Sequence, residues 1–261
     1  MTEKFGELIG VDISKSYPQK GLPAKKVLEN CSFKFEPSRL NVVMGTSGCG
    51  KSTLANILAG YLSPDKGEIT IDGQPINKPS SDRLMVFQET ALWPWMTVEN
   101  NVIFGPLSKG VKKQEAVNES NILLNRFGLE DFKQKYPNQL SGGMMRRAEL
   151  AQALINRPKV MILDEPFRGL DVMTRELMQE YYLKLFEDTK LSTVFITAEL
   201  EEALILADKI FIMSESPGSI VEVIDVDLPR PRDISSVTTK RYAELEQQAL
   251  KALYAGQDEI I

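Results

Sequence analysis

The sequence predicts an α/β protein with a parallel sheet, an antiparallel β-layer near the N-terminus and an inserted all-helical subdomain. Beyond residue 160, short apolar runs alternate with helical segments, which favours a parallel sheet covered by helices. Before residue 73, the runs are short and alternating, as in antiparallel strands. From about residue 98 to 157 the apolar periodicity is helical, with few β-branched runs.

In the N-terminal layer, Leu8–Lys15 and Glu68–Asp72 alternate and predict strands. Residues 16–23 contain two prolines and a glycine and are predicted to form a loop. The next strand is predicted over Val27–Phe35, with four side chains facing inward: Val27, Cys31, Phe33 and Phe35.

The remaining strands are predicted at 40–44, 83–87, 160–163, 193–197 and 209–213, and helices at 54–59, 174–188, 200–207 and 239–254. One face of the last helix carries Tyr242, Leu245, Ala249 and Leu253, which we expect to pack onto the body of the protein. Together the elements predict one domain over residues 1–235, with its helical subdomain at about 98–157, and a C-terminal helical extension over 236–261.

The composition is that of an ordinary globular protein of 261 residues, with a net charge of −5. The acidic balance argues against nucleic acid as the main partner, because duplex binding relies on Lys and Arg. Cys31 and Cys49 do not suggest a disulfide framework, so we expect a reducing cytosol. No run of 18 apolar residues and no signal peptide is present, so we expect no membrane span.

The chain carries the phosphate-binding pattern G-x-x-x-x-G-K-[ST] between a predicted strand and a predicted helix. Glycines let backbone N–H groups curl around a polyanion, and the helix N-terminus adds its dipole. Lys51 supplies charge for the outer phosphates and Ser52 an oxygen ligand for Mg²⁺. We therefore predict a phosphate-loop NTPase core in which these residues hold the nucleotide: Gly45, Thr46, Ser47, Gly48, Cys49, Gly50, Lys51, Ser52 and Thr53.

Two acids follow the apolar run 160–163, at the strand end where sheets of this class bind ligands. Asp164 is placed to hold Mg²⁺, directly or through water, and Glu165 to orient and activate a water for attack on the γ-phosphate. A second anion-binding helix start is predicted where Ser-Gly-Gly opens the helix after residue 144. One nucleotide does not need two such helix starts from one chain, so we expect two copies of the chain to face each other. Each ATP would then lie between the phosphate loop of one copy and four residues of the other copy: Ser141, Gly142, Gly143 and Met144.

This order of motifs resembles the ATP-binding cassette (ABC) ATPases over nearly the whole chain. The resemblance implies ATP and Mg²⁺ as cofactors, with Tyr17 stacking on adenine. It also implies that Gln88 contacts Mg²⁺ and the attacking water, and that Asp171 belongs to a loop touching the opposite subunit.

Within that family the chain is most similar to the cytoplasmic ATPases of importers for nitrate, sulfonates, taurine or bicarbonate. The segments that carry this similarity are 93–102, 216–219 and 226–232. It implies a peripheral subunit on the cytoplasmic membrane face, with membrane permease subunits docking near Gln88 and Trp93–Val98 and an extracytoplasmic solute-binding protein acting indirectly. Trp93 and Trp95 on a predicted loop favour docking, because tryptophan is enriched at binding hot spots.

The sequence departs from the family at two positions. Ala198 stands where the family has a histidine that contacts the γ-phosphate and helps hold the attacking water and Glu165. We therefore expect ATP to bind but hydrolysis to be severely slowed. Two origins of Ala198 stay open: a substitution introduced to trap the ATP-bound state, or a natural subunit that pairs with a complete one. Arg168 replaces a small residue and either reaches across the dimer or lies in solvent.

Two alternatives belong to other functional classes. A soluble ABC ATPase of translation or DNA repair usually has two cassettes or a long coiled-coil insertion, and this chain has neither. A soluble metabolic NTPase would leave the Ser-Gly-Gly segment and the tryptophan loop without a role. The transported solute, and whether the dimer contains one or two kinds of ATPase chain, are not decided by this sequence.

Overall fold

The computed structural model describes residues 5–232 and 234–255. Its larger sheet has six strands in the order β10-β9-β3-β8-β7-β6. The five strands from β9 to β6 run parallel, and β10 is antiparallel to β9. Their bounds are β3 Leu40–Met44, β6 Arg83–Val86, β7 Val160–Asp164, β8 Ser192–Thr197, β9 Lys209–Met213 and β10 Ile220–Asp225.

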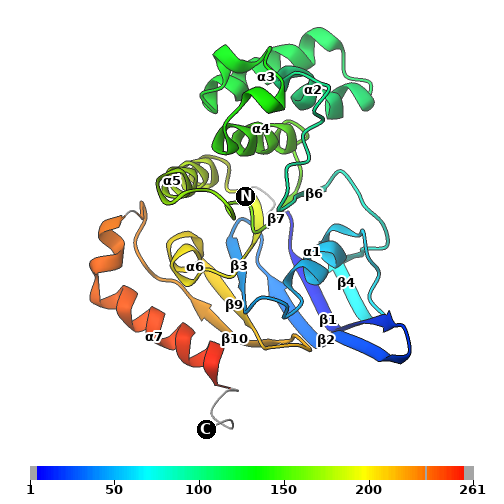
Figure 1. Ribbon diagram of the computed structural model, residues 1–261, viewed down its shortest axis with the longest axis vertical. Helices are drawn as coiled ribbons and strands as arrows, with labels where there is room; N and C mark the ends of the chain where they lie inside the picture. Colours follow the sequence, from blue (N-terminus) through cyan, green and yellow to red (C-terminus); the bar gives the residue numbers. More distant parts are fainter. Residues whose placement is uncertain (1–4, 233, 256–261) are drawn as a thin grey trace.

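The second sheet is antiparallel, with the order β2-β1-β4-β5. Its strands are β1 Leu8–Gln19, β2 Leu22–Phe35, β4 Lys66–Ile71 and β5 Gln74–Pro75. Helix α1 (Lys51–Ala59) packs against β2 of this sheet and against β6, β7 and β8 of the parallel sheet (Figure 1). The predicted N-terminal antiparallel layer is therefore confirmed, and it covers the helix that follows the phosphate loop.

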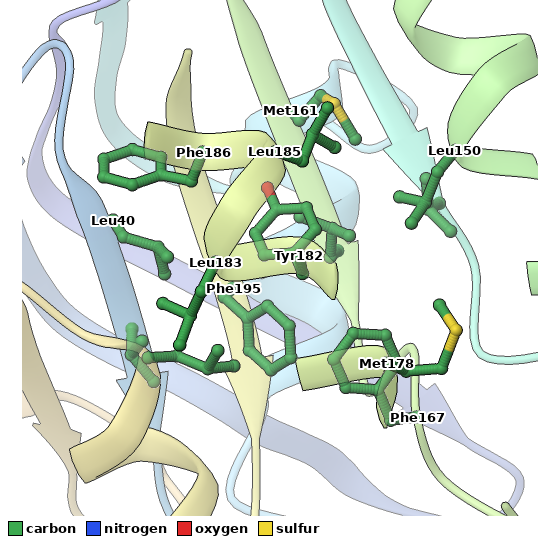
Figure 2. Close-up of a cluster of buried hydrophobic side chains, with 14 of the residues drawn as sticks. Leu40, Leu150, Met161, Phe167, Met178, Tyr182, Leu183, Leu185, Phe186 and Phe195 are labelled. Carbon is green, nitrogen blue, oxygen red and sulfur yellow. The ribbon is translucent and has the colours of Figure 1, made fainter. Parts of the chain in front are cut away.

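The central strands are buried on both faces, so neighbouring residues of one strand point into different apolar clusters. In β3, Val42 belongs to one cluster and Val43 to the other, and both are fully buried. The first cluster packs α5 (Val172–Thr189) and α6 (Leu200–Leu206) onto the sheet, with Tyr182 over Phe195 (Figure 2). This double burial explains the continuous apolar runs in the sequence.

The predicted helical insert is confirmed as α2 (Val98–Ser108), α3 (Lys113–Arg126) and α4 (Gly142–Leu154), with two short 3-10 turns at Glu130–Phe132 and Pro137–Gln139. These helices lie together at one end of the molecule (Figure 1). The C-terminal helix α7 (Lys240–Tyr254), preceded by a 3-10 turn at Ile234–Thr238, packs on α6, β9 and β10. Its Tyr242, Leu245 and Ala249 are buried, as expected for packing onto the body. Within the described residues, no helix has the length and apolar character that crossing a membrane requires.

Two predictions about the strands were wrong, and one strand was missed. The predicted loop 16–23 is mostly strand, since β1 and β2 continue as a hairpin around Lys20 and Gly21, with Tyr17 opposite Lys25. Pro18 is tolerated because this extension has no strand on its other side. Leu28 rather than Val27 is buried, since the β1–β2 register shifts near Asn30, whose φ is +48°. Strand β10 was not predicted.

Candidate functional site

The phosphate loop follows the fully buried strand β3 and runs into α1. Gly48 and Gly50 have φ values of +84° and +110°, a region that side chains with a Cβ rarely adopt. A Cβ on Gly50 would also lie 2.8 Å from Cδ2 of Leu28. These constraints account for the glycines and leave the loop backbone open to a bound anion.

Lys51 is buried at the base of this loop. Its ammonium donates hydrogen bonds to the carbonyls of Gly45 at 2.8 Å and Thr46 at 3.0 Å. It also lies 3.7 Å from Oε1 of Glu165. A single cation thus connects the loop to the carboxylate at the end of β7.

A cavity of about 310 Å³ opens at the loop. Tyr17 stands beside it, half-exposed, with its hydroxyl 3.4 Å from the Thr53 hydroxyl. Cys49, by contrast, has a buried side chain that faces Gly45, so only its backbone is available to a ligand. The cavity brings together eight predicted site residues with Val27 and Arg168: Ser47, Gly48, Gly50, Lys51, Ser52, Thr53, Gln88 and Glu165.

Asp164 ends β7 and is buried. Burial raises the pKa of its carboxyl group, and a hydrogen bond accepted from Ser52 opposes this shift only in part. Its Oδ1 is buried and has no hydrogen-bond partner among the described residues. A buried carboxylate oxygen without a partner, next to a serine hydroxyl, fits the oxygen ligands that Mg²⁺ takes beside a nucleotide. Asp164 and Ser52, together with Gln88, which lines the phosphate-loop cavity beside Ser52, are the residues that would hold this ion.

Glu165 has a strained backbone, with φ of +44°, and a nearly buried side chain. Its two carboxylate oxygens face different cations: Oε1 faces Lys51, and Oε2 accepts a 2.7 Å hydrogen bond from Nη1 of Arg168. The two alternatives for Arg168, a reach across the dimer or a position in solvent, therefore both left out its contact with Glu165. Its half-exposed side chain turns back onto the carboxylate of its own chain.

Ala198 lies just beyond the end of β8, close to both Glu165 and Ser47 of the phosphate loop. It lines a second cavity of about 130 Å³, together with Ser47, Glu165, Arg168 and Glu202. Ala198 contributes only a methyl group to this wall. The position predicted for the missing histidine therefore does adjoin the carboxylate that the histidine would support.

Ser141, Gly142, Gly143 and Met144 do not line either cavity. Ser141 caps α4, and its hydroxyl accepts the Met144 amide at 3.3 Å. Asp171 caps α5 and accepts the Thr174 amide at 3.0 Å, and hydrogen bonds from Thr174 lower its pKa. A Cβ on Gly143 would lie 2.8 Å from Thr174, so the two helix starts adjoin each other, and both remain exposed.

Comparison with known proteins identifies the family. The ABC transporter family model matches residues 28–168. The chain is 39% identical over 248 residues to the aliphatic sulfonates import ATP-binding protein SsuB of Bacillus cereus, covering 95% of this chain and 96% of that protein. It is 44% identical over 195 residues to the taurine import ATP-binding protein TauB of Roseobacter denitrificans, covering 75% and 73%.

The chain belongs to the ABC transporter family. It is an ATP-binding protein of that family, in the class of ATP-hydrolysing translocases. Its fold matches a dimeric ATP-binding cassette solved in a post-hydrolysis state with ADP and Pi, with a TM-score of 0.73, 27% identity, and coverage of 84% of this chain and 98% of that one.

Two buried charges that the sequence analysis missed connect α4 of this ABC protein to the Gln88 loop. Arg146 donates 2.7 Å hydrogen bonds to the carbonyls of Phe87 and Gln88 and to Glu149. Glu149 in turn accepts the amide of Ala91. Burial lowers the pKa of Arg146 and raises that of Glu149, and their attraction opposes both shifts. The sequence could have indicated that Arg146 is buried, because at helical spacing it shares a face with Gly143 and Leu150, which are both buried.

The tryptophan loop forms one wall of a third cavity, of about 330 Å³. Trp93 packs on Phe104 with ring centroids 4.3 Å apart, while Trp95 is 68% exposed. Asn101, fully buried, accepts the Trp93 amide at 2.7 Å and donates to carbonyls of the same loop. The lining of this groove also includes Phe87 and Glu149, so the groove adjoins the linkage between α4 and Gln88.

Proposed function

We propose that this chain is the ATPase subunit of an ABC importer for a small organic sulfonate, of the taurine or alkanesulfonate type. The observation that carries the proposal is the cavity in which Lys51, Ser52 and Glu165 meet. The relatives that import sulfonates and taurine favour this solute class over nitrate or bicarbonate.

In this proposal the loop amides and Lys51 bind the phosphates, and Tyr17 lies beside the adenine. Mg²⁺, when bound, supplies positive charge to the β- and γ-phosphates, and Ser52, Asp164 and Gln88 would hold it. Glu165 orients the attacking water and accepts its proton. The exposed helix starts at Ser141 and Asp171 are free to complete the site of a second copy.

Closure of two copies around ATP would drive the membrane subunits. The groove lined by Trp93, Phe104 and Phe87 has the aromatic, half-open character of a docking site for a helix of those subunits. The chain would then act as a peripheral subunit at the cytoplasmic membrane face. An extracytoplasmic binding protein would select the solute.

Hydrolysis is proposed to be slow because Ala198 offers no donor for the γ-phosphate or for the attacking water. Preorganised donors of this kind contribute about 100-fold to 1000-fold in rate. The substitution Ala198→His in the full chain should raise the single-turnover rate of ATP hydrolysis by about 100-fold. The dissociation constant for Mg-ATP should stay within about twofold, because binding relies mainly on the phosphate loop.

Quenched-reaction measurements with radiolabelled ATP would give the single-turnover hydrolysis rates of the unmodified chain and of Ala198→His. A rate for the unmodified chain equal to that of Ala198→His would contradict impaired hydrolysis. The solute is tested separately, by uptake of taurine, an alkanesulfonate and nitrate into vesicles carrying the complete transporter. ATP-dependent uptake of nitrate but of neither sulfonate would overturn the proposed solute class.

A further inference from the structure

Arg168 occupies a fixed place between two anchored residues. Phe167 before it is buried in the core and packs on Phe195, with ring centroids 5.5 Å apart (Figure 2). Gly169 after it has φ of +80°, and the Arg168 amide donates to the Glu165 carbonyl at 3.2 Å. The turn therefore holds the Arg168 backbone close to Glu165 and directs its side chain away from the core.

The guanidinium of Arg168 borders both cavities of the site. It lines the phosphate-loop cavity together with Lys51 and the second cavity together with Ala198. Arg175 also borders the second cavity, but its guanidinium donates to the Leu170 carbonyl at 3.3 Å. Of these two arginines, only Arg168 lines both cavities that adjoin Glu165.

The contact between Arg168 and Glu165 fixes the orientation of the Glu165 carboxylate. With Oε2 held by Arg168 at 2.7 Å, Oε1 is left on the side of Lys51. A charge-assisted hydrogen bond to a nearly buried carboxylate restricts its rotation. Because the Arg168 side of the pair is exposed to solvent, the contact would add little to stability, so its effect should appear in the reaction rather than in folding.

We propose that Arg168 is a positioning residue for Glu165 and takes over part of the support that the side chain at position 198 does not give. The inference rests on the proposed ATPase function. It explains why an arginine stands in a tight turn beside the carboxylate. It also predicts that Arg168 matters most when position 198 is alanine.

The test compares four full-length chains: unmodified, Arg168→Gln, Ala198→His and the double variant. Arg168→Gln should slow single-turnover hydrolysis about tenfold when position 198 is alanine, and about twofold or less in the Ala198→His background. Mg-ATP affinity should stay within about twofold in all four. Arg168→Lys should recover part of the lost rate, because an ammonium still donates to the carboxylate.

Arg157→Gln is the matched control, since it breaks an exposed Arg–Glu pair away from the site and should leave the rate unchanged. Equal losses from Arg168→Gln in both backgrounds, or no loss in either, would overturn the inference alone. No Mg-ATP binding by the unmodified chain would overturn the proposed function and the inference with it.

Discussion

Glu202 is a buried carboxyl group that lines the Ala198 cavity. Burial raises its pKa, and the negative charge of Glu199 adds to the shift. Hydrogen bonds from Thr197 and Gln179 and the positive charge of Arg175 oppose it. A titratable group so close to the reaction centre makes the stability of this region depend on pH.

The sign follows from the raised pKa. The neutral Glu202 carboxyl stabilises the fold fully below its pKa in the unfolded chain, near 4.5. This stabilisation is lost as the pH rises through the higher pKa of the folded protein. Compared with Glu202→Gln, the unmodified chain should therefore lose free energy of unfolding from about pH 4.5 upward until the group is ionised. Urea denaturation of both proteins between pH 4.5 and 8 measures this difference. Parallel profiles would contradict the prediction.

The sequence predicted the backbone position of candidate site residues best where a motif sets it. The phosphate loop lies between a strand and a helix, and Asp164 and Glu165 lie at a strand end, as the local pattern predicted. Arg168 was not, because its partner depends on a turn geometry that no local pattern specifies. The roles expected for Tyr17 and Asp171 need a nucleotide or a second copy and stay predictions.

At the scale of elements, α4 is the link between distant parts of the site. Its N-terminus presents Ser141, and one turn later Arg146 holds the Gln88 loop, which borders the tryptophan groove. Helices were predicted well because their periodicity is local. The hairpin extension of β1 and β2 and the edge strand β10 were not predicted, because they form by pairing with another strand and not from a local pattern.

Arg146→Met tests the link. Removing the guanidinium leaves Glu149 buried without its charge partner, which should cost about 3–5 kcal/mol in the free energy of unfolding. Arg147→Met, which loses one hydrogen bond to the Phe127 carbonyl, should cost about 1 kcal/mol. Chemical denaturation of both variants compares the two costs. Equal losses would show that the buried pair does not hold the loop.

At the scale of the whole molecule, the phosphate loop and the Ser141 helix start belong to different regions of one chain. The loop joins β3 to α1, whereas Ser141 caps α4 in the helical subdomain (Figure 1). Neither cavity joins them. The proposed composite site would therefore be a property of the assembly. The motifs suggested it, but one chain cannot display it.

Complementation tests this directly. Lys51→Ala removes the phosphate cation, and Ser141→Arg blocks the helix start expected to face the other copy's ATP. Each variant alone should trap no ATP, because both sites of its dimer are defective. In an equal mixture, half of the dimers are mixed, and each of those holds one intact site, formed by the Lys51 of one copy and the Ser141 of the other. Occluded ATP should therefore recover to roughly a quarter of the unmodified level, as filter retention of radiolabelled ATP would measure. If both residues served one nucleotide within a single chain, mixing would give only the average of the two inactive proteins.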